Sequence, residues 1–113
     1  MKIILTLFSM TVLLTLISTS TAMTVSPVAA ADAAAIYSAK CAKCHGSDGS
    51  GVEKYKKKGQ KAFTDAAWQK SRSDGQLNAS ITNGKGEAMA AWKGKLTAEE
   101  IKALVAYVRS LKK

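Results

Sequence analysis

The hydrophobic and polar positions along the chain predict a helix on each side of a glycine-punctuated middle. All eight glycines lie between Gly46 and Gly94. Near the C-terminus the apolar residues recur at the i, i+3, i+4 and i+7 spacing of an amphipathic helix: Ile101, Leu104, Val105, Val108 and Leu111. The segment 33–43 is rich in alanine, has good helix propensity and also gathers its apolar side chains on one face. No stretch alternates as a half-buried strand does, so we expect a small all-α domain.

Two capping boxes predict where helices begin. Thr97 stands three residues before Glu100, and Ser73 stands three residues before Gln76. In this motif the hydroxyl accepts from the third helical amide while the Glu or Gln side chain reaches back to the cap. The helix that follows Ser73 is expected to stop at the Asn-Gly pair 83–84.

Two long loops, 46–63 and 84–96, separate these helices, with a possible short turn of helix at 64–70. Long loops in a compact domain are usually functional. Acidic residues open the last helix and Arg109, Lys112 and Lys113 close it, which matches the helix macrodipole.

The N-terminus predicts export. A basic start is followed by an apolar run at 3–17 and a small-residue stretch at 26–35, the order of a secretory signal peptide. We expect cleavage after Ala30 or Ala31, which makes 1–31 the signal and leaves one domain at 32–113. An uncleaved anchor is the alternative, but the run falls short of the roughly 20 residues that span a bilayer. The prediction is a periplasmic or equivalent extracytoplasmic protein without stable membrane insertion.

The charge narrows the choice of partner. The chain has 17 basic and 8 acidic residues, and removal of Lys2 with the signal leaves a net charge of +8. Such a charge favours an acidic protein surface or an anionic membrane, and after export nucleic acid is not expected. The lysine-rich run at 54–61 is either a solvated loop or a docking patch.

The motif CAKCH holds both cysteines and the only histidine of the chain. On a helix Cys41, Cys44 and His45 occupy i, i+3 and i+4 and share one face. Two thiols can there bond the vinyl groups of a haem while the imidazole ligates its iron, which is why C-x-x-C-H is the attachment signature of haem c. A structural zinc site needs four ligands, a thioredoxin-like pair needs a βαβ context, and an inert disulfide leaves the histidine unexplained. The motif predicts one covalent haem c.

The second axial ligand decides the chemistry of such a haem. With a single histidine, bis-histidine ligation is excluded, and Met89 is the only methionine left after signal cleavage. It lies in a glycine-rich loop, whereas methionines that fill cores sit on apolar helix faces. A lysine, a water or an empty position is the alternative. Ligation by histidine and methionine raises the reduction potential and predicts one-electron transfer by a protein that is not itself an enzyme.

At this point the chain resembles the class I c-type cytochromes, the small monohaem electron carriers of exported compartments. The resemblance covers the mature chain and rests on IYSAKCAKCHGSDGSG (36–51), ITNGKGEAM (81–89) and LTAEEIKALVAYVRSL (96–111). It implies three to five helices around the haem, with the first and last crossing. It also implies that Cys41 and Cys44 form the thioethers and that His45 and Met89 are the axial ligands of the iron.

The resemblance further implies that Tyr37 packs at the helix crossing against Leu104 and Tyr107. Ala33 stands where the family often has the glycine of closest approach.

Two prolines common in the family are missing from the mature chain. One normally supplies a carbonyl to the second nitrogen of the ligand histidine, so another carbonyl of the 52–62 loop is expected to take that role. The other follows the ligand methionine, where Ala90 stands, and its absence predicts a less rigid loop.

Three functions remain open on the residues. The leading one is a soluble electron shuttle whose redox partners present an acidic docking surface. The alternatives are a haem subunit of a larger dehydrogenase or oxidase, and a haem sensor or enzyme with an open sixth position.

Overall fold

The N-terminal helical segment is longer than its sequence pattern predicts. The computed structural model describes residues 26–113, so most of the predicted signal peptide lies outside the described residues. Three helices follow one another without a break: α1 (Pro27–Ile36), the π-helical η1 (Tyr37–Cys41) and α2 (Ala42–His45). The Ser26 hydroxyl accepts from the Ala29 amide at 3.2 Å, and Pro27 occupies the first turn, where a missing N–H costs nothing. The helix therefore begins six residues before the expected start at 33.

The remaining helices are α3 (Glu53–Lys56), α4 (Ala66–Lys70), α5 (Asp74–Asn83) and α6 (Ala98–Ser110). The expected helices after Ser73 and Thr97 are confirmed, and so is the short turn at 64–70. The single turn α3 was not expected, since it lies inside the predicted loop 46–63. Counting α1, η1 and α2 as one, residues 26–113 hold five helical segments, at the upper end of the predicted range.

The two capping boxes differ in completeness. At Ser73 both halves form: its hydroxyl accepts from the Gln76 amide at 3.1 Å, and its own amide donates to Gln76 Oε1 at 2.9 Å. At Thr97 the hydroxyl accepts from the Glu100 amide at 3.1 Å. The reciprocal bond from Glu100 does not form among the described residues, so this half of the prediction is wrong.

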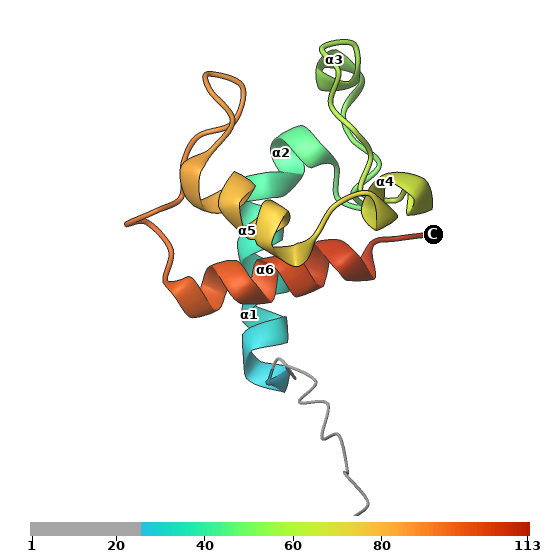
Figure 1. Cartoon of the computed structure of the whole chain (residues 1–113). Helices are drawn as coiled ribbons and strands as arrows, with labels where there is room; N and C mark the ends of the chain where they lie inside the picture. Colours follow the sequence, from blue (N-terminus) through green and yellow to red (C-terminus); the bar gives the residue numbers. More distant parts are fainter. Residues whose placement is uncertain (1–25) are drawn as a thin grey trace, which may run out of the picture.

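The first and last helices cross, as the resemblance implied (Figure 1). Ala33 is 0 % exposed and lies in one core cluster with Ala103, so two small side chains meet between the helices. Tyr37 and Leu104, 1 % and 2 % exposed, share that cluster, and the rings of Tyr37 and Tyr107 are 4.9 Å apart. Burying a leucine side chain stabilises a fold by about 1.5–3 kcal/mol. The predicted packing of Tyr37 is confirmed.

A second core cluster joins α5 to α6 through Leu77, Val105 and Val108. Phe63 and Ile81 pack against both clusters. These two side chains therefore connect the helix crossing to the middle of the chain.

The long loop 84–96 links α5 to α6 and carries two isolated bridges, Lys85 to Met89 and Lys93 to Leu96. Residues 26–113 contain no β-strand, which confirms the all-α class. In the same range no helix has the length and apolar character needed to cross a membrane.

Candidate functional site

His45 ends α2, and hydrogen bonds to its own carbonyl and to that of Gly46 hold the main chain there. Gly46 stops the helix with φ 79°, a left-handed value that glycine adopts without strain. The hydroxyl of Tyr37 donates to the Gly46 carbonyl at 2.7 Å, and the Gly51 amide donates to the His45 carbonyl at 2.8 Å. The position of the imidazole is thus tied both to the buried helix crossing and to the loop that follows.

The environment of His45 favours the neutral form of its ring. Burial lowers the pKa of the imidazole below its usual value. Its ring stacks on that of Phe63, with centroids 4.4 Å apart. A neutral imidazole has one nitrogen lone pair free, which is the form that binds a metal.

The two cysteines are each half-buried and form no disulfide with one another. Burial, and secondarily the neighbouring Cys44, raises the pKa of the Cys41 thiol. Cys44 lies beside Tyr55, and this proximity raises the pKa of that phenol. Since Cys41 is the last residue of η1, the regular α-helical spacing expected for the motif holds only from Ala42 to His45.

A cavity of about 310 Å³ brings His45 together with Met89, 44 positions later in the chain. Its apolar walls come from Phe63, Trp68, Leu77, Ile81 and Val108. A smaller hollow of about 30 Å³ is lined by both predicted ligands and also by Cys41, Tyr37 and Trp92. Cys44 does not line either space.

This donor set fits a flat, apolar, metal-containing macrocycle. His45 and Met89 line one cavity, whose volume lies at the lower end of the roughly 300–1,000 Å³ of ligand pockets. The walls between His45 and Met89 are mostly apolar, and Cys41 lines the smaller hollow that shares both residues.

The Met89 loop is fastened to the end of α5. The Lys85 amide donates to the Met89 carbonyl at 2.9 Å, and the amides of Trp92 and Lys93 donate to the last turn of α5 at 3.0 and 3.1 Å. Gly84, with φ 71°, lies directly against this loop: a Cβ there would stand 2.5 Å from the Met89 carbonyl oxygen. The position of Met89 therefore depends on the absence of a side chain at residue 84.

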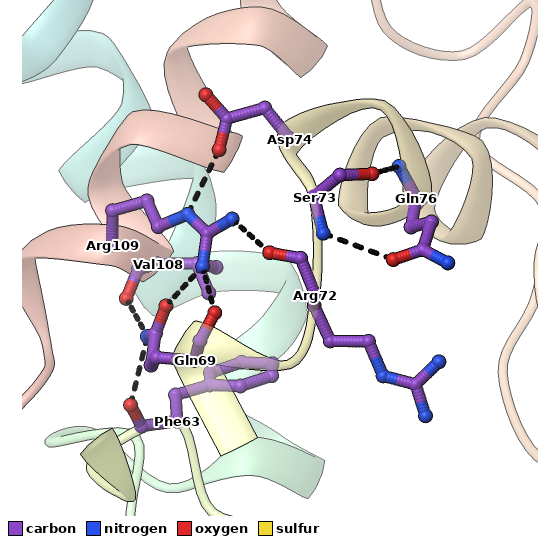
Figure 2. A network of polar contacts seen from close by, with 8 residues as sticks. All are labelled: Phe63, Gln69, Arg72, Ser73, Asp74, Gln76, Val108 and Arg109. Carbon is purple, nitrogen blue, oxygen red and sulfur yellow. Dashed lines mark hydrogen bonds and ion pairs between the residues drawn. The ribbon is translucent and has the colours of Figure 1, made fainter. Parts of the chain in front are cut away.

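A network around Arg109 ties together Phe63, Arg72 and Val108, three of the residues that line the cavity (Figure 2). The guanidinium donates to the Gln69 carbonyl at 2.5 Å, to Gln69 Oε1 at 2.9 Å, to Asp74 at 2.8 Å and to the Arg72 carbonyl. Gln69, only 3 % exposed, donates in turn to the carbonyls of Phe63 and Val108, each at 2.8 Å. The sequence pattern assigned Arg109 only a charge near a helix end, so this contribution was missed.

The sequence analysis also missed the polar residues that line the cavity: Gln60, Lys61, Arg72, Gln76, Ser80 and Lys85. Their one sequence signal is the α5 periodicity, in which Gln76 and Ser80 are neighbours of the buried Leu77 and the partly buried Ile81. Gln60 Oε1 is a buried oxygen that has no hydrogen-bond partner among residues 26–113. The acceptor expected for the second nitrogen of His45 stays a prediction, since no such bond is formed within this range.

The comparisons with known proteins all point to one family. The profile of "Cytochrome C oxidase, cbb3-type, subunit III" matches residues 28–108. The cbb3-type cytochrome c oxidase subunit FixP of Azorhizobium caulinodans is 40% identical over 83 residues, which cover 74% of this chain and 27% of that protein. The subunit CcoP of Cereibacter sphaeroides is 31% identical over 81 residues, 72% of this chain and 27% of that protein. The chain thus spans about a quarter of the length of these curated relatives.

Among solved structures the chain is similar to the KustC0563 c-type cytochrome. The two share 41% sequence identity with a TM-score of 0.68, over 72% of this chain and 98% of that one. A tyrosine-to-phenylalanine mutant of the same cytochrome matches with 40% identity and a TM-score of 0.66, over 72% of this chain and 99% of that one.

Proposed function

From the premise that the chain belongs to the family of cbb3-type cytochrome c oxidase subunit III and is a small c-type cytochrome with covalent haem c, we propose that Cys41 and Cys44 form the thioethers and that His45 and Met89 ligate the iron. The observation that carries the assignment is the shared cavity of His45 and Met89. A bound haem c supplies a one-electron redox couple, and the domain is an electron carrier.

The chain's own residues keep such a site rigid and dry. Tyr37 and Gly51 fix the main chain around His45. The main-chain bonds of the Met89 loop and its close approach to Gly84 fix Met89. The apolar side chains around both ligands exclude water. A site that changes little between two oxidation states suits electron transfer, while a closed sixth position disfavours ligand chemistry.

Replacing the sulfur ligand tests this assignment. In Met89→Ala we expect the oxidised protein to lose the long-wavelength charge-transfer band of iron–sulfur ligation, and the reduced protein to bind carbon monoxide. Met89→Leu removes the thioether but keeps the volume, so it separates ligation from packing. If the reduced wild type already binds carbon monoxide readily, the site is open and a haem sensor or enzyme is the better assignment.

The attachment is tested separately on denatured protein. Haem should remain with the wild-type chain after unfolding and should be lost or singly attached in Cys41→Ser and Cys44→Ser. Wild-type chain without haem after denaturation would contradict the assignment of both cysteines.

We propose that the physiological role is that of a haem c electron-transfer subunit serving a larger oxidase. The names of the FixP and CcoP relatives support this role. The free shuttle is the second candidate, because a c-type cytochrome structure is matched over 98% of its length. Purification under native conditions distinguishes them: co-elution with oxidase subunits supports the first, and a free monomer supports the second.

The proposed partner surface is acidic. The basic run at 54–61 places exposed lysines on α3 and the turn after it, and such charges steer the encounter with an oppositely charged surface. Raising the ionic strength should then slow electron exchange with the oxidase. An association rate that does not change with salt would remove the acidic surface from the proposal.

Export remains part of the proposal. Residues 1–31 are the predicted signal, and the last of them belong to α1. We propose a mature, periplasmic chain that begins at Ala31 or Asp32. Mass measurement of the native protein would show this start, and an intact Met1 would favour an anchored form.

A further inference from the structure

The wall of the cavity that α5 provides has a polar edge. Gln76 and Ser80 lie one turn apart on α5, and Arg72 precedes its cap, so the three residues follow one another at intervals of four. All three line the cavity that contains His45 and Met89. The lining residues also include Lys61 and Lys85 but no carboxylate. Hydrogen-bond donors and positive charge therefore accumulate along this edge without an acidic partner.

Arg72 has a fixed main chain and an unengaged side chain. Its carbonyl accepts from Arg109, and the next residue, Ser73, is held by the complete capping box. Figure 2 shows the Arg72 side chain running away from this network. Within residues 26–113 its guanidinium takes part in no ion pair or hydrogen bond.

The acidic side chains nearest to it in the sequence are already used. Asp74 pairs with Arg109 at 2.8 Å, and Asp65 accepts from the Trp68 amide at 3.0 Å. The Arg72 guanidinium is thus available to a group that arrives from the cavity.

Gln76 adds a donor with a defined direction. Its Oε1 accepts from the Ser73 amide at 2.9 Å, so the two N–H groups of its Nε2 are left for another acceptor. A guanidinium and an amide donor on one rim are suited to a carboxylate, because planar N–H groups match its two oxygens.

We propose that Arg72 and Gln76 form a carboxylate-binding subsite and that it takes one propionate of the haem. This inference rests on the proposed function. Arg72 supplies the charge and two parallel donors, and Gln76 supplies a further donor without leaving its role in the cap of α5. Both act as positioning residues, since neither contacts the iron.

The test follows the midpoint potential of the holoprotein as a function of pH. The potential falls as a propionate ionises, because the carboxylate stabilises the oxidised haem. A cation within a few ångströms lowers a carboxyl pKa by about 1–3 units, so Arg72→Gln should move this fall to higher pH by about that much. Arg72→Lys keeps the charge but loses the planar donor pair, and it should give a smaller displacement.

Two further variants isolate the subsite. Lys70→Gln removes the same charge from an exposed residue that does not line the cavity, and its profile should match the wild type. Gln76→Glu keeps an oxygen for the Ser73 amide and replaces the donor by a second carboxylate oxygen, so it too should move the fall to higher pH.

The outcomes separate the two proposals. Unchanged profiles in Arg72→Gln and Gln76→Glu, or an equal displacement in Lys70→Gln, would overturn the subsite while covalent haem in the same samples upholds the attachment. Wild-type protein without covalent haem would overturn both.

Discussion

The contact between Gly84 and the Met89 loop gives a sharp prediction about what holds the sulfur in place. Gly84 has φ 71°, and an added Cβ would stand 2.5 Å from the Met89 oxygen, 2.7 Å from the Ala91 nitrogen and 2.8 Å from the Ala90 carbonyl carbon. All three atoms are main chain, so a rotamer change cannot relieve the overlap. In Gly84→Ala the loop itself has to move away from α5.

The magnitude has two parts. An L-residue in the left-handed region costs about 1–2 kcal/mol. Moving the loop also breaks the bond from the Lys85 amide to the Met89 carbonyl, 2.9 Å long, and a hydrogen bond of this kind contributes about 0.5–1.5 kcal/mol. We expect Gly84→Ala to lose about 1.5–3.5 kcal/mol in the free energy of unfolding and, with the loop displaced, to weaken or lose ligation by Met89.

Gly86 provides a matched control in the same loop. Its φ is 63°, and a Cβ there would meet nothing within 4 Å in the described part of the chain. Gly86→Ala should therefore show the backbone strain of about 1–2 kcal/mol alone and keep its sulfur ligand. Both variants are measured by denaturant unfolding and by the charge-transfer band of the oxidised protein. Equal stabilities together with an intact band in Gly84→Ala would refute the reasoning.

Three further predictions concern the supports of the site. Arg109→Lys keeps the charge but loses the planar set of donors to Gln69 and Arg72, so denaturant unfolding should show a loss of about 1.5–3 kcal/mol in stability. Asp74→Asn breaks an ion pair whose side chains are 29 % and 76 % exposed, and it should cost less than about 1 kcal/mol. A larger loss in Asp74→Asn than in Arg109→Lys would contradict this. Tyr37→Phe removes the donor to the Gly46 carbonyl and should cost about 0.5–1.5 kcal/mol, whereas Tyr107→Phe, whose hydroxyl makes no bond within residues 26–113, should cost less. Two hydrogen bonds from Ser50 lower the pKa of Asp48 from 3.8 to about 2. The stabilising effect of Asp48 is therefore complete above about pH 4 and is lost as the pH falls through 2. Asp48→Asn should flatten this dependence of stability on acid pH, and an unchanged dependence would exclude Asp48 as its source.

What the sequence could predict was local. The start of α5 follows from Ser73 and Gln76, three residues apart, and the cap needs no distant partner. The motif at Cys41–His45 is equally local, and Met89 followed from counting the remaining candidates and from the glycine-rich loop around it. Each of these predictions depends on residues whose chemistry is visible without a fold.

The missing features depend on contacts between distant segments. Arg109 reaches residues 35 to 40 positions away, and nothing near it in the chain distinguishes it from other basic residues of a last helical turn. Gln69 looks like an exposed polar residue of a short helix, yet it is buried because Val108 and Phe63 need its donors. The turn α3 is a single turn in a lysine-rich stretch, and a segment of that length has no period to detect.

The loop around Met89 illustrates how tertiary contacts can take over a role that a single residue has elsewhere. The absence of a proline after Met89 predicted a less rigid loop, but two main-chain bonds and the close approach at Gly84 tie this loop to α5, and a third main-chain bond closes it between Lys85 and Met89. Helix α5 is in turn held by its complete cap, by the Asp74–Arg109 pair and by the Leu77 cluster on α6. The position of Met89 therefore depends on α5, and the position of α5 depends on α6. Helix α6 in turn crosses the helix that leads to His45. Since His45 and Met89, the two proposed ligands, are positioned through one pair of crossing helices, a disturbance at that crossing should loosen both of them together.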